Sequence, residues 1–212
     1  AFMEATLCSN LRTAAVSTVA AKYLSISNPQ TISFVGAGQQ ARFHFGAMIS
    51  VFPSIKKCYV SSRTQNSESD FIDVLKNNYP YIEFVGCNSD YELAVTNADI
   101  LVSAISGQCP IIKANWIQKG TLYIHVGGWE DEFAVAHKAD KIVCDNWDSV
   151  KHRTQTLSRL YKSGEITDDN FERCNYGKIQ IRKKNNYSGI SEVLCEDYDP
   201  NVIKSAIKKL NK

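Results

Sequence analysis

The stretch "TISFVGAGQQARFHFGAM", residues 31–48, decides the fold. It begins with a short run of β-branched and aromatic residues, which is typical of a strand that is buried on both faces. Gly36, Gly38 and Ala41 follow directly, and apolar residues then recur with helical spacing. The spacing therefore predicts a strand, a turn rich in small residues and a helix, in that order.

This order gives the small residues a specific meaning, because G-x-G-x-x-A between a strand and a helix is the dinucleotide-binding fingerprint. Gly36 permits the tight turn, Gly38 keeps a side chain out of the path of the pyrophosphate, and Ala41 lets the helix pack closely on the strand. The helix N-terminus presents unpaired N–H groups to the phosphates. The alternative is a turn that needs glycines only for its shape, and the surrounding strand, helix and later repeats disfavour it.

Strand-like and helix-like segments continue to alternate after this motif. Such alternation predicts parallel strands, because a parallel connection is long enough to hold a helix. We therefore expect an α/β fold with a doubly wound, mostly parallel Rossmann-type sheet and flanking helices. The segments that indicate strands are "KCYVSS", "IEFVGC", "DILVSAI", "TLYIHVGG" and "KIVCD", and those that indicate helices are "SESDFIDVLKNN", "SDYELAVTNA" and "DEFAVAHKA".

Other helices are expected on both sides of this core. An apolar stripe predicts a helix over about residues 5–24, with Val16, Val19, Ala20, Tyr23 and Leu24 on its buried face. A long polar-faced helix is expected from Trp147 to Gly164, and another begins in "TDDNFE", residues 167–172. The chain is thus interpreted as a linking helix (residues 1–25), a dinucleotide-binding domain (26–165) and a helical or irregular C-terminal segment (166–212).

Composition excludes several classes of protein. The 212 residues are 44% hydrophobic with a formal net charge of +2, which favours a soluble globular protein and gives no reason to expect nucleic acid or membrane as a partner. The local basic run "KIQIRKKNN" (178–186) is interpreted as solvated surface. The odd number of scattered cysteines contains no C-x-x-C pair, which predicts reduced thiols in a cytoplasmic protein, no disulfide framework and no metal site: Cys8, Cys58, Cys87, Cys109, Cys144, Cys174 and Cys195.

The end of the second predicted strand indicates which dinucleotide is preferred. An NAD site usually has a carboxylate there for the ribose hydroxyl, but this strand ends in Ser61, Ser62, Arg63 and Thr64. Hydroxyls and a guanidinium suit a 2′-phosphate, because Arg makes paired, charge-assisted hydrogen bonds to it. The sequence favours NADP(H) over NAD(H). The alternative is that Arg63 is an exposed turn residue.

Five segments together resemble the ornithine cyclodeaminase and μ-crystallin family in their order and spacing. They are "LRTAAVSTVAAKYL" (11–24), "FVGAGQQARFHF" (34–45), "VSSRT" (60–64), "ADILVSAIS" (98–106) and "HVGG" (125–128). The resemblance implies a dimer with a nicotinamide dinucleotide on a Rossmann domain. It also implies hydride transfer at the Cα of a small amino or imino acid, by cyclodeamination, amino acid dehydrogenation or ketimine reduction.

The resemblance also assigns expected roles to single residues. Arg12 matches the family arginine that lies beside the cofactor and holds the substrate carboxylate, and Thr13 follows it in the motif. Gln39 and Gln40 match the pair that touches the pyrophosphate, and Ser62 stands where NAD-using members have an acid. The remaining matches lie beside the cofactor, and they are Ser103, Val126, Gly127 and Gly128.

Two departures from the family pattern limit these expectations. Trp129 stands where cyclodeaminases have the aspartate that serves as acid/base, and three acids follow it, of which Asp131 is chosen as the replacement. The alternative is that these acids begin a solvated helix while Trp129 covers a pocket or interface. The family segment before the arginine helix, which contributes to the substrate domain, is not found in this sequence, so a fragment or a reduced relative is expected.

Two functions therefore stay open: an oxidoreductase, and a non-catalytic module that binds NADP without chemistry. A short-chain reductase is disfavoured, because Tyr161 is followed by Lys162 rather than by a lysine four positions on. Of the four histidines, His125 at a strand end could donate a proton, although a structural role is the simpler interpretation. His152 is expected on the surface or at a dimer contact, and Cys8 as a small buried residue.

Overall fold

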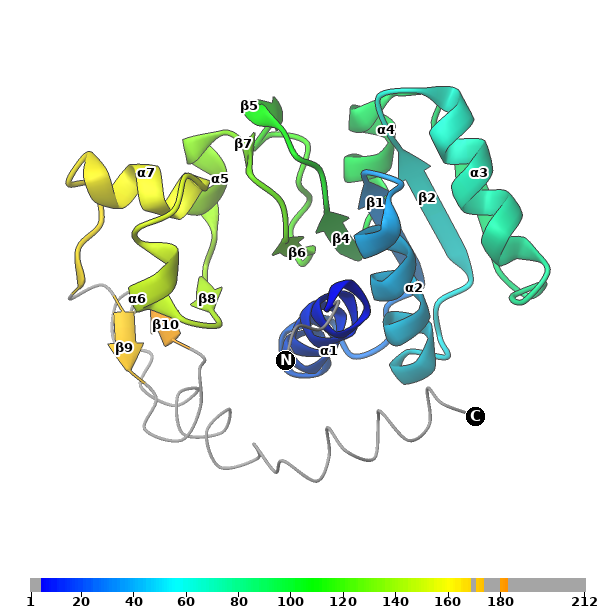
Figure 1. The fold of residues 1–212 in the computed structure, drawn as a ribbon, viewed down its shortest axis with the longest axis horizontal. Helices are drawn as coiled ribbons and strands as arrows, with labels where there is room; N and C mark the ends of the chain where they lie inside the picture. Colours follow the sequence, from blue (N-terminus) through cyan, green and yellow to red (C-terminus); the bar gives the residue numbers. More distant parts are fainter. Residues whose placement is uncertain (1–4, 169–170, 174–179, 183–212) are drawn as a thin grey trace. The chain divides into compact units, whose positions relative to one another are not determined.

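We describe a computed structural model in which residues 5–168, 171–173 and 180–182 are defined. The chain divides into two compact units, Ala1–Val135 and Ala136–Lys212. The elements of the first unit, shown in blue to green in Figure 1, are α1 (Thr6–Leu24), β1 (Thr31–Val35), α2 (Gln39–Val51), β2 (Lys57–Ser61), α3 (Gln65–Lys76), β3 (Glu83–Gly86), α4 (Tyr91–Thr96), β4 (Ile100–Ser103), β5 (Gln108–Ile112), β6 (Leu122–His125) and β7 (Trp129–Asp131). The domain boundaries expected from the sequence stay a prediction.

The centre of the first unit is a five-stranded parallel sheet with the strand order β3-β2-β1-β4-β6. The order starts at β1 and runs outward in both directions, which is the doubly wound arrangement. The fold class expected from the sequence is therefore confirmed. Val35, Ser61, Ser103 and His125 lie in one register row, so β1, β2, β4 and β6 end at the same edge of the sheet.

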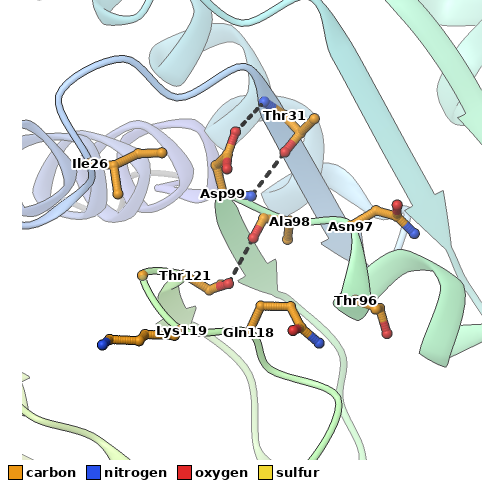
Figure 2. Close-up of a pocket in the computed structure, with 10 residues that line it drawn as sticks. Ile26, Thr31, Thr96, Asn97, Ala98, Asp99, Gln118, Lys119 and Thr121 are labelled. Atoms are coloured by element: carbon orange, nitrogen blue, oxygen red, sulfur yellow. Dashed lines mark hydrogen bonds between the residues drawn. The ribbon is translucent and has the colours of Figure 1, made fainter.

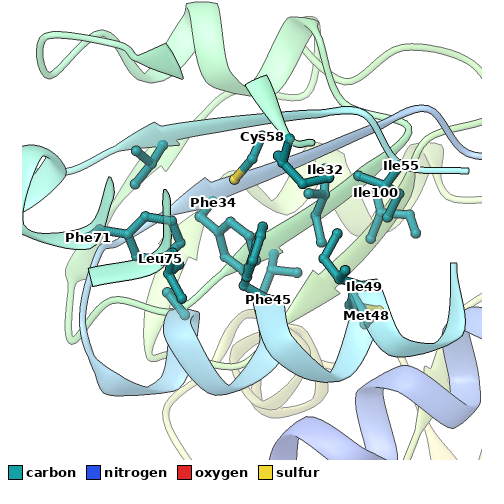
Figure 3. Close-up of a cluster of buried hydrophobic side chains, with 14 of the residues drawn as sticks. Ile32, Phe34, Phe45, Met48, Ile49, Ile55, Cys58, Phe71, Leu75 and Ile100 are labelled. Atoms are coloured by element: carbon teal, nitrogen blue, oxygen red, sulfur yellow. The ribbon is translucent and has the colours of Figure 1, made fainter. Parts of the chain in front are cut away.

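The hydrophobic core lies where α2 and α3 cover one face of this sheet. Three phenylalanines from three elements meet there, with ring centroids 5.4 to 6.3 Å apart (Figure 3): Phe34, Phe45 and Phe71. All three are fully buried, as are Ile32 and Met48. Offset and edge-to-face aromatic contacts of this kind add to the burial of apolar area. The core thereby fixes α2 against β1 and sets the position of the loop between them.

Helix α1 packs against α2 with a different face from the one expected. Its buried residues are small or polar and recur every three or four positions: Asn10, Ala14, Thr18 and Ala21. The predicted apolar stripe is instead half-buried, and Tyr23 near its end is exposed. Cys8 on the same helix, expected to be buried, is exposed as well. Small side chains allow the two helices to approach closely, so the packing selects them over the larger residues of the stripe.

A small parallel pair, β5 with β7, was not expected from the sequence. It pairs residues that follow β4 with residues that follow β6. Trp129, Glu130 and Asp131 make up β7, and the two acids are buried. The interpretation of these acids as a solvated helix start is therefore wrong, because the helix begins later, at Phe133.

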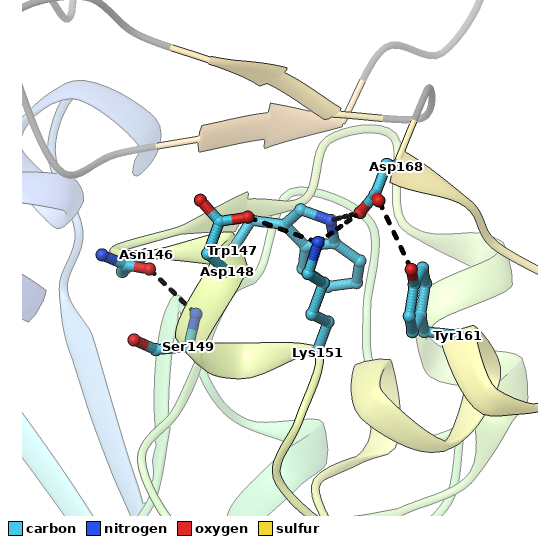
Figure 4. Close-up of polar contacts among 7 residues, drawn as sticks. All are labelled: Asn146, Trp147, Asp148, Ser149, Lys151, Tyr161 and Asp168. Carbon is cyan, nitrogen blue, oxygen red and sulfur yellow. Dashed lines mark hydrogen bonds and ion pairs between the residues drawn. The ribbon is translucent and has the colours of Figure 1, made fainter.

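The expected long helix from Trp147 to Gly164 is also wrong, because the structure has two short ones. Helix α5 (Phe133–Lys138) crosses the boundary between the units, and β8 (Val143–Cys144), α6 (Trp147–Val150) and α7 (Thr156–Lys162) follow. In the second unit Asp168 accepts hydrogen bonds from Trp147 Nε1, Lys151 Nζ and Tyr161 Oη (Figure 4). Lys151 also pairs with Asp148 at 3.3 Å. These contacts hold Lys151 in a turn, which ends α6 at that point.

Two further expectations for the second unit are corrected by its three-stranded sheet, which has the order β8-β10-β9. Strand β9 (Phe171–Arg173) replaces the helix that was expected to begin in residues 167–172, because it pairs with β10 (Gln180–Arg182) in antiparallel register. Strand β10 lies within the basic run interpreted as surface, and the rest of that run lies outside the described residues. Strand β8 pairs with β10 instead of joining the main sheet.

Candidate functional site

The turn after β1 is shaped by Gly36. Its φ of +107° lies in the region that side chains rarely adopt, and its N–H donates to the Ser61 carbonyl at 2.8 Å. A Cβ added to Gly36 would lie 2.5 Å from the carbonyl oxygen of Ala104. Gly36 therefore lets the chain turn between the ends of two neighbouring strands, as the fingerprint requires.

Gly38, in contrast, borders open space. It is the N-cap residue of α2, its φ of −78° suits any residue, and no atom lies within 4 Å of an added Cβ. Three residues later Ala41 is fully buried against the sheet. A helix N-terminus with unpaired N–H groups and an uncrowded approach over a glycine is an anion-binding site. The residues present thus fit the pyrophosphate of a dinucleotide.

The side chains of Gln39 and Gln40 are tied to α1. Asn10 Nδ2 donates to Gln39 Oε1 at 3.1 Å, and Gln40 Nε2 donates to Asn10 Oδ1 at 2.8 Å. These two bonds fasten the start of α1, two residues before Arg12, to the first turn of α2. Sequence reasoning missed Asn10, because its burial depends on the packing of α1 against α2.

His44 makes a second link between the same helices. Its ring nitrogens lie 2.7 Å from the Gln40 carbonyl and 2.9 Å from Ser17 Oγ. The ring is buried, and burial lowers the pKa of His44 from its ordinary value of 6.5, although the bond to Gln40 opposes the change. The imidazole is therefore neutral in the folded protein at neutral pH, where Nδ1–H donates to the Gln40 carbonyl and Nε2 faces the Ser17 hydroxyl.

We expect this histidine to make stability depend on pH. The pKa of His44 is lower in the folded than in the unfolded state, so below about pH 6.5 the unfolded state binds more protons and the free energy of unfolding falls. Above that pH the contribution is fully present. Urea unfolding between pH 5 and 8 measures the slope, which His44→Gln should reduce. The exposed His152 is the matched control, and an equal reduction in His152→Gln would contradict the assignment.

The loop after β2 is organised by a residue that sequence reasoning missed, Glu68. Its buried carboxylate accepts the backbone N–H groups of Ser62 at 2.9 Å, Asn88 at 2.8 Å and Ser89 at 2.8 Å. Asn88 and Ser89 both have positive φ values, 55° and 64°. Glu68 therefore joins the loop after β2 to the loop after β3 at the same edge of the sheet.

The predicted ribose-phosphate residues lie in this braced loop. The Ser62 hydroxyl donates to the Thr64 carbonyl at 2.8 Å, and Thr64 Oγ1 accepts the Ser67 N–H at the start of α3. Arg63 between them is exposed. Burial raises the pKa of Tyr91 and the Glu68 charge adds to this, whereas the nearby Arg63 charge opposes it. The charge of Arg63 thus acts on Tyr91, the first residue of α4.

The turn after β6 contains the buried acids. Glu130 is fully buried and accepts a short hydrogen bond from Ser103 Oγ at the end of β4. A Cβ on Gly127 would lie 2.5 and 2.6 Å from the two Glu130 oxygens, so the carboxylate packs directly against the Gly127 backbone. Asp131 is also buried, and its Oδ1 lies 3.7 Å from His125 Nδ1. Ser103, Gly127 and the acids thus form one polar cluster.

A pocket at the opposite edge of the sheet is separate from this cluster. It lies where β1, β4 and β6 begin, and Asp99 in its wall accepts the backbone N–H group of Thr31 (Figure 2). Asp99 also accepts the backbone N–H group of Gln30. Thr121 donates to the Ala98 carbonyl beside it. Ligands of open α/β sheets bind at the carboxyl ends of the strands, so the pocket is not the candidate site.

Among the described residues no cluster of His, Cys, Asp and Glu suits a metal ion. The same residues contain no helix with the length and apolar composition of a membrane span.

Comparison with known proteins decides the family. The sequence model of the ornithine cyclodeaminase/mu-crystallin family matches residues 1–169. The chain belongs to this family. The resemblance expected from the five segments is confirmed, and the relatives of the chain include an alanine dehydrogenase and a Δ1-pyrroline-2-carboxylate reductase.

Two curated members of the family show how much of a whole protein the chain represents. N-((2S)-2-amino-2-carboxyethyl)-L-glutamate dehydrogenase of Staphylococcus aureus is 28% identical over 169 residues, which are 80% of this chain and 50% of that protein. Alanine dehydrogenase of Archaeoglobus fulgidus is 30% identical over 158 residues, which are 72% of this chain and 47% of that protein. The chain spans about half the length of the curated relatives it matches.

Two solved structures of the family have the same fold. An archaeal alanine dehydrogenase dimer with bound NAD matches with a TM-score of 0.70 and 28% identity, over 77% of this chain and 50% of that one. The Δ1-pyrroline-2-carboxylate reductase of Thermococcus litoralis in complex with NADH and L-proline matches with a TM-score of 0.61 and 29% identity, over 65% of this chain and 43% of that one.

Within this family member the structure gathers most of the expected site residues at one edge. Gly36, Gly38, Ser62 and Ser103 follow or end the strands of that edge, and residues 126–128 follow β6. Arg12 is exposed on α1, while Thr13 bonds back to Ser9 within the helix. Val126, Gly127 and Gly128 are half-buried, and Trp129 stacks on Phe133 with ring centroids 6.1 Å apart. The roles of these residues stay predictions.

Proposed function

We propose that the protein containing this chain is a nicotinamide-dependent oxidoreductase that moves a hydride to or from the Cα of a small amino or imino acid. The observation that carries the proposal is the open approach over Gly38 at the N-terminus of α2, in a chain of this family. Relatives that include an alanine dehydrogenase and a pyrroline-carboxylate reductase support this substrate class. Amino acid dehydrogenation, ketimine reduction and cyclodeamination are the candidate reactions, in a homodimer.

The cofactor would be held along the edge where the strands end. The α2 N-terminus would bind the pyrophosphate, with Gln39 and Gln40 beside it. The backbone of residues 126–128 and the Ser103 side chain would lie next to the nicotinamide. The loop of Ser62, Arg63 and Thr64 would receive the ribose. We favour NADP(H) because this loop contains a guanidinium and no carboxylate. The nearby carboxylate of Glu68 already accepts three backbone N–H groups, so it is not available to a ribose hydroxyl. NAD(H) is the alternative, and relatives with bound NAD or NADH support it.

The substrate would be oriented by Arg12. Its guanidinium suits the substrate carboxylate, because a planar fork of donors pairs with two carboxylate oxygens. The two bonds from Asn10 to Gln39 and Gln40 hold this part of α1 beside the pyrophosphate site. Fixing the carboxylate would bring Cα to the nicotinamide, which supplies or accepts the hydride when bound. Asp131, the carboxylate expected to serve the proton transfer at the substrate nitrogen, is buried and would assist that transfer without touching the substrate.

A second candidate function is a module that binds the dinucleotide without catalysis. The observation that favours it is Trp129, which replaces the family's acid/base aspartate and stacks on Phe133. Under this alternative the cofactor edge is retained while the chemistry is lost. Measuring turnover of cyclic imines and amino acids in the full-length protein separates the two functions, because only the first changes nicotinamide absorbance.

We expect Arg63→Ala to remove the preference for NADPH. Loss of one exposed, charge-assisted contact should weaken NADPH binding by roughly tenfold and leave NADH binding unchanged, since only NADPH has the 2′-phosphate. Calorimetric titration of the full-length protein with both dinucleotides measures this. Lys119→Ala is the matched control, because it removes a charge at the opposite edge of the sheet. Tighter binding of NADH by the wild type would overturn the NADP(H) proposal, and binding of neither would overturn the function.

A further inference from the structure

His125 lies at the edge of the sheet that would receive the cofactor. It is the last residue of β6 and stands in register with Ser103, which in turn stands in register with Val35, the residue before Gly36. The same row of the sheet therefore ends in the fingerprint turn on β1 and in His125 on β6. The imidazole of His125 therefore lies at the edge of the sheet that is formed by the carboxyl ends of β1, β4 and β6.

The hydrogen bonds of His125 determine which nitrogen exchanges a proton. Its Nε2 lies 2.8 Å from the carbonyl oxygen of Gly128. A carbonyl only accepts hydrogen bonds, so Nε2 has the hydrogen in both the neutral and the charged form. Nδ1 is then the nitrogen that gains or loses a proton. It faces Asp131 Oδ1 at 3.7 Å, a distance at which a charged imidazole and a carboxylate attract each other.

The surroundings favour the charged form of this ring. Glu130 Oε1 lies 3.4 Å from Nε2, and the Tyr123 ring stacks on the imidazole at 6.0 Å between centroids. Burial by itself lowers the pKa of His125, but the hydrogen bond to Glu130 and the charges of Asp131 and Glu130 raise it, with the net change upward. Tyr123, whose pKa is raised well above 10 by burial, stays neutral. Among the described residues, the charged groups that act on His125 are these two carboxylates.

Of the three side chains of His125, Glu130 and Asp131, that of the histidine reaches the surface. The side chain of His125 is 19% exposed, whereas those of Glu130 and Asp131 are 0% and 3% exposed. Glu130 is further fixed by the Ser103 hydroxyl and by its contact with the Gly127 backbone. A buried carboxylate cannot meet a substrate nitrogen, but it stabilises an imidazolium beside it. Asp131 would therefore act through His125.

We propose that His125 is the proton donor and acceptor of this site, with Asp131 and Glu130 as positioning residues. This inference rests on the proposed function. As hydride adds to the Cα of an imine, the proton on Nδ1 moves to the imine nitrogen, so the C=N bond becomes a CH–NH unit and the imidazole becomes neutral. In the reverse direction Nδ1 takes a proton from the amine. Solvent then returns a proton to the imidazole, whose side chain is 19% exposed.

NMR tests the pairing of His125 with Asp131 without any measurement of enzymatic activity. Histidine-labelled full-length protein should show His125 with hydrogen on Nε2 and a pKa above the ordinary 6.5, and Asp131→Asn should lower that pKa. His137, which pairs with Glu165 at 3.0 Å, is the internal control and should not respond. A His125 that is neutral at pH 7 and indifferent to Asp131→Asn overturns the proposal.

Kinetics of His125→Gln test the transfer itself. Glutamine keeps an N–H for the Gly128 carbonyl but has no titratable nitrogen. We expect the rate of imine reduction to fall about 100-fold with the affinity for NADPH unchanged, and the pH dependence assigned to His125 to disappear. An equal rate in wild type and variant overturns this proposal alone. A wild type that binds no dinucleotide overturns the proposed function, and the proton transfer with it.

Discussion

Replacement of Gly38 by valine is expected to lower the affinity for a nicotinamide dinucleotide about 100-fold while the protein stays folded. No atom lies within 4 Å of a Cβ at this position, and the φ of −78° suits a side chain, so the substitution meets no obstacle within the described chain. The new side chain would instead stand where the pyrophosphate approaches the α2 N–H groups. Loss of two hydrogen bonds to a charged group, at about 1.5 kcal/mol each, gives this factor.

The matched control is Gly46→Ala in the same helix. A Cβ there meets only Tyr79 Oη at 3.7 Å, and Gly46 lies two turns beyond the helix N-terminus. Calorimetric titration with NADPH should separate the two variants, while thermal unfolding should show both folded. Wild-type affinity in Gly38→Val would mean that the open space is not a phosphate path. Gly36→Ala offers the opposite test, since its Cβ would strike the Ala104 carbonyl at 2.5 Å and destabilise the fold itself.

The sequence predicted the parts of the site that depend on neighbours along the chain. Gly36, Gly38 and Ala41 serve one turn and one helix start, so their spacing alone indicates their structure. The order of strands and helices likewise predicted the doubly wound sheet. The same local logic failed for residues 147–164, because a tertiary contact of Asp168 with Lys151 fixes a turn that helical periodicity does not reveal.

The burial of the acids after Trp129 could not be predicted from the neighbouring sequence for a similar reason. Glu130 and Asp131 follow each other in a polar run, which is typical of an exposed helix start. Their burial results from the pairing of β5 with β7 and from the Ser103 hydroxyl 27 positions earlier. The meeting of His125 with Asp131 depends on the same pairing. Such contacts are visible only once the register of β4 and β6 is known.

The role of Glu68 could not be predicted from its neighbours in the sequence, because two of its three hydrogen-bond partners lie 20 and 21 positions away. We expect Glu68→Gln to lower the free energy of unfolding by about 2 to 3 kcal/mol. Oε1 accepts the N–H groups of Ser62 and Ser89, so glutamine would keep its oxygen there and turn its NH2 group toward the Asn88 N–H. One hydrogen bond to a charged group would be lost, and two donors would face each other in a buried place.

Urea unfolding at pH 7 measures this change, with Glu92→Gln as the matched control, because Glu92 is an exposed acid in the first turn of α4. The control should change stability by less than about 0.5 kcal/mol. Equal stability of the two variants would show that the three short contacts of Glu68 contribute little. If the expected loss occurs, NADPH affinity should also fall in Glu68→Gln but not in Glu92→Gln. The reason is that Arg63 follows Ser62, whose backbone Glu68 holds in place.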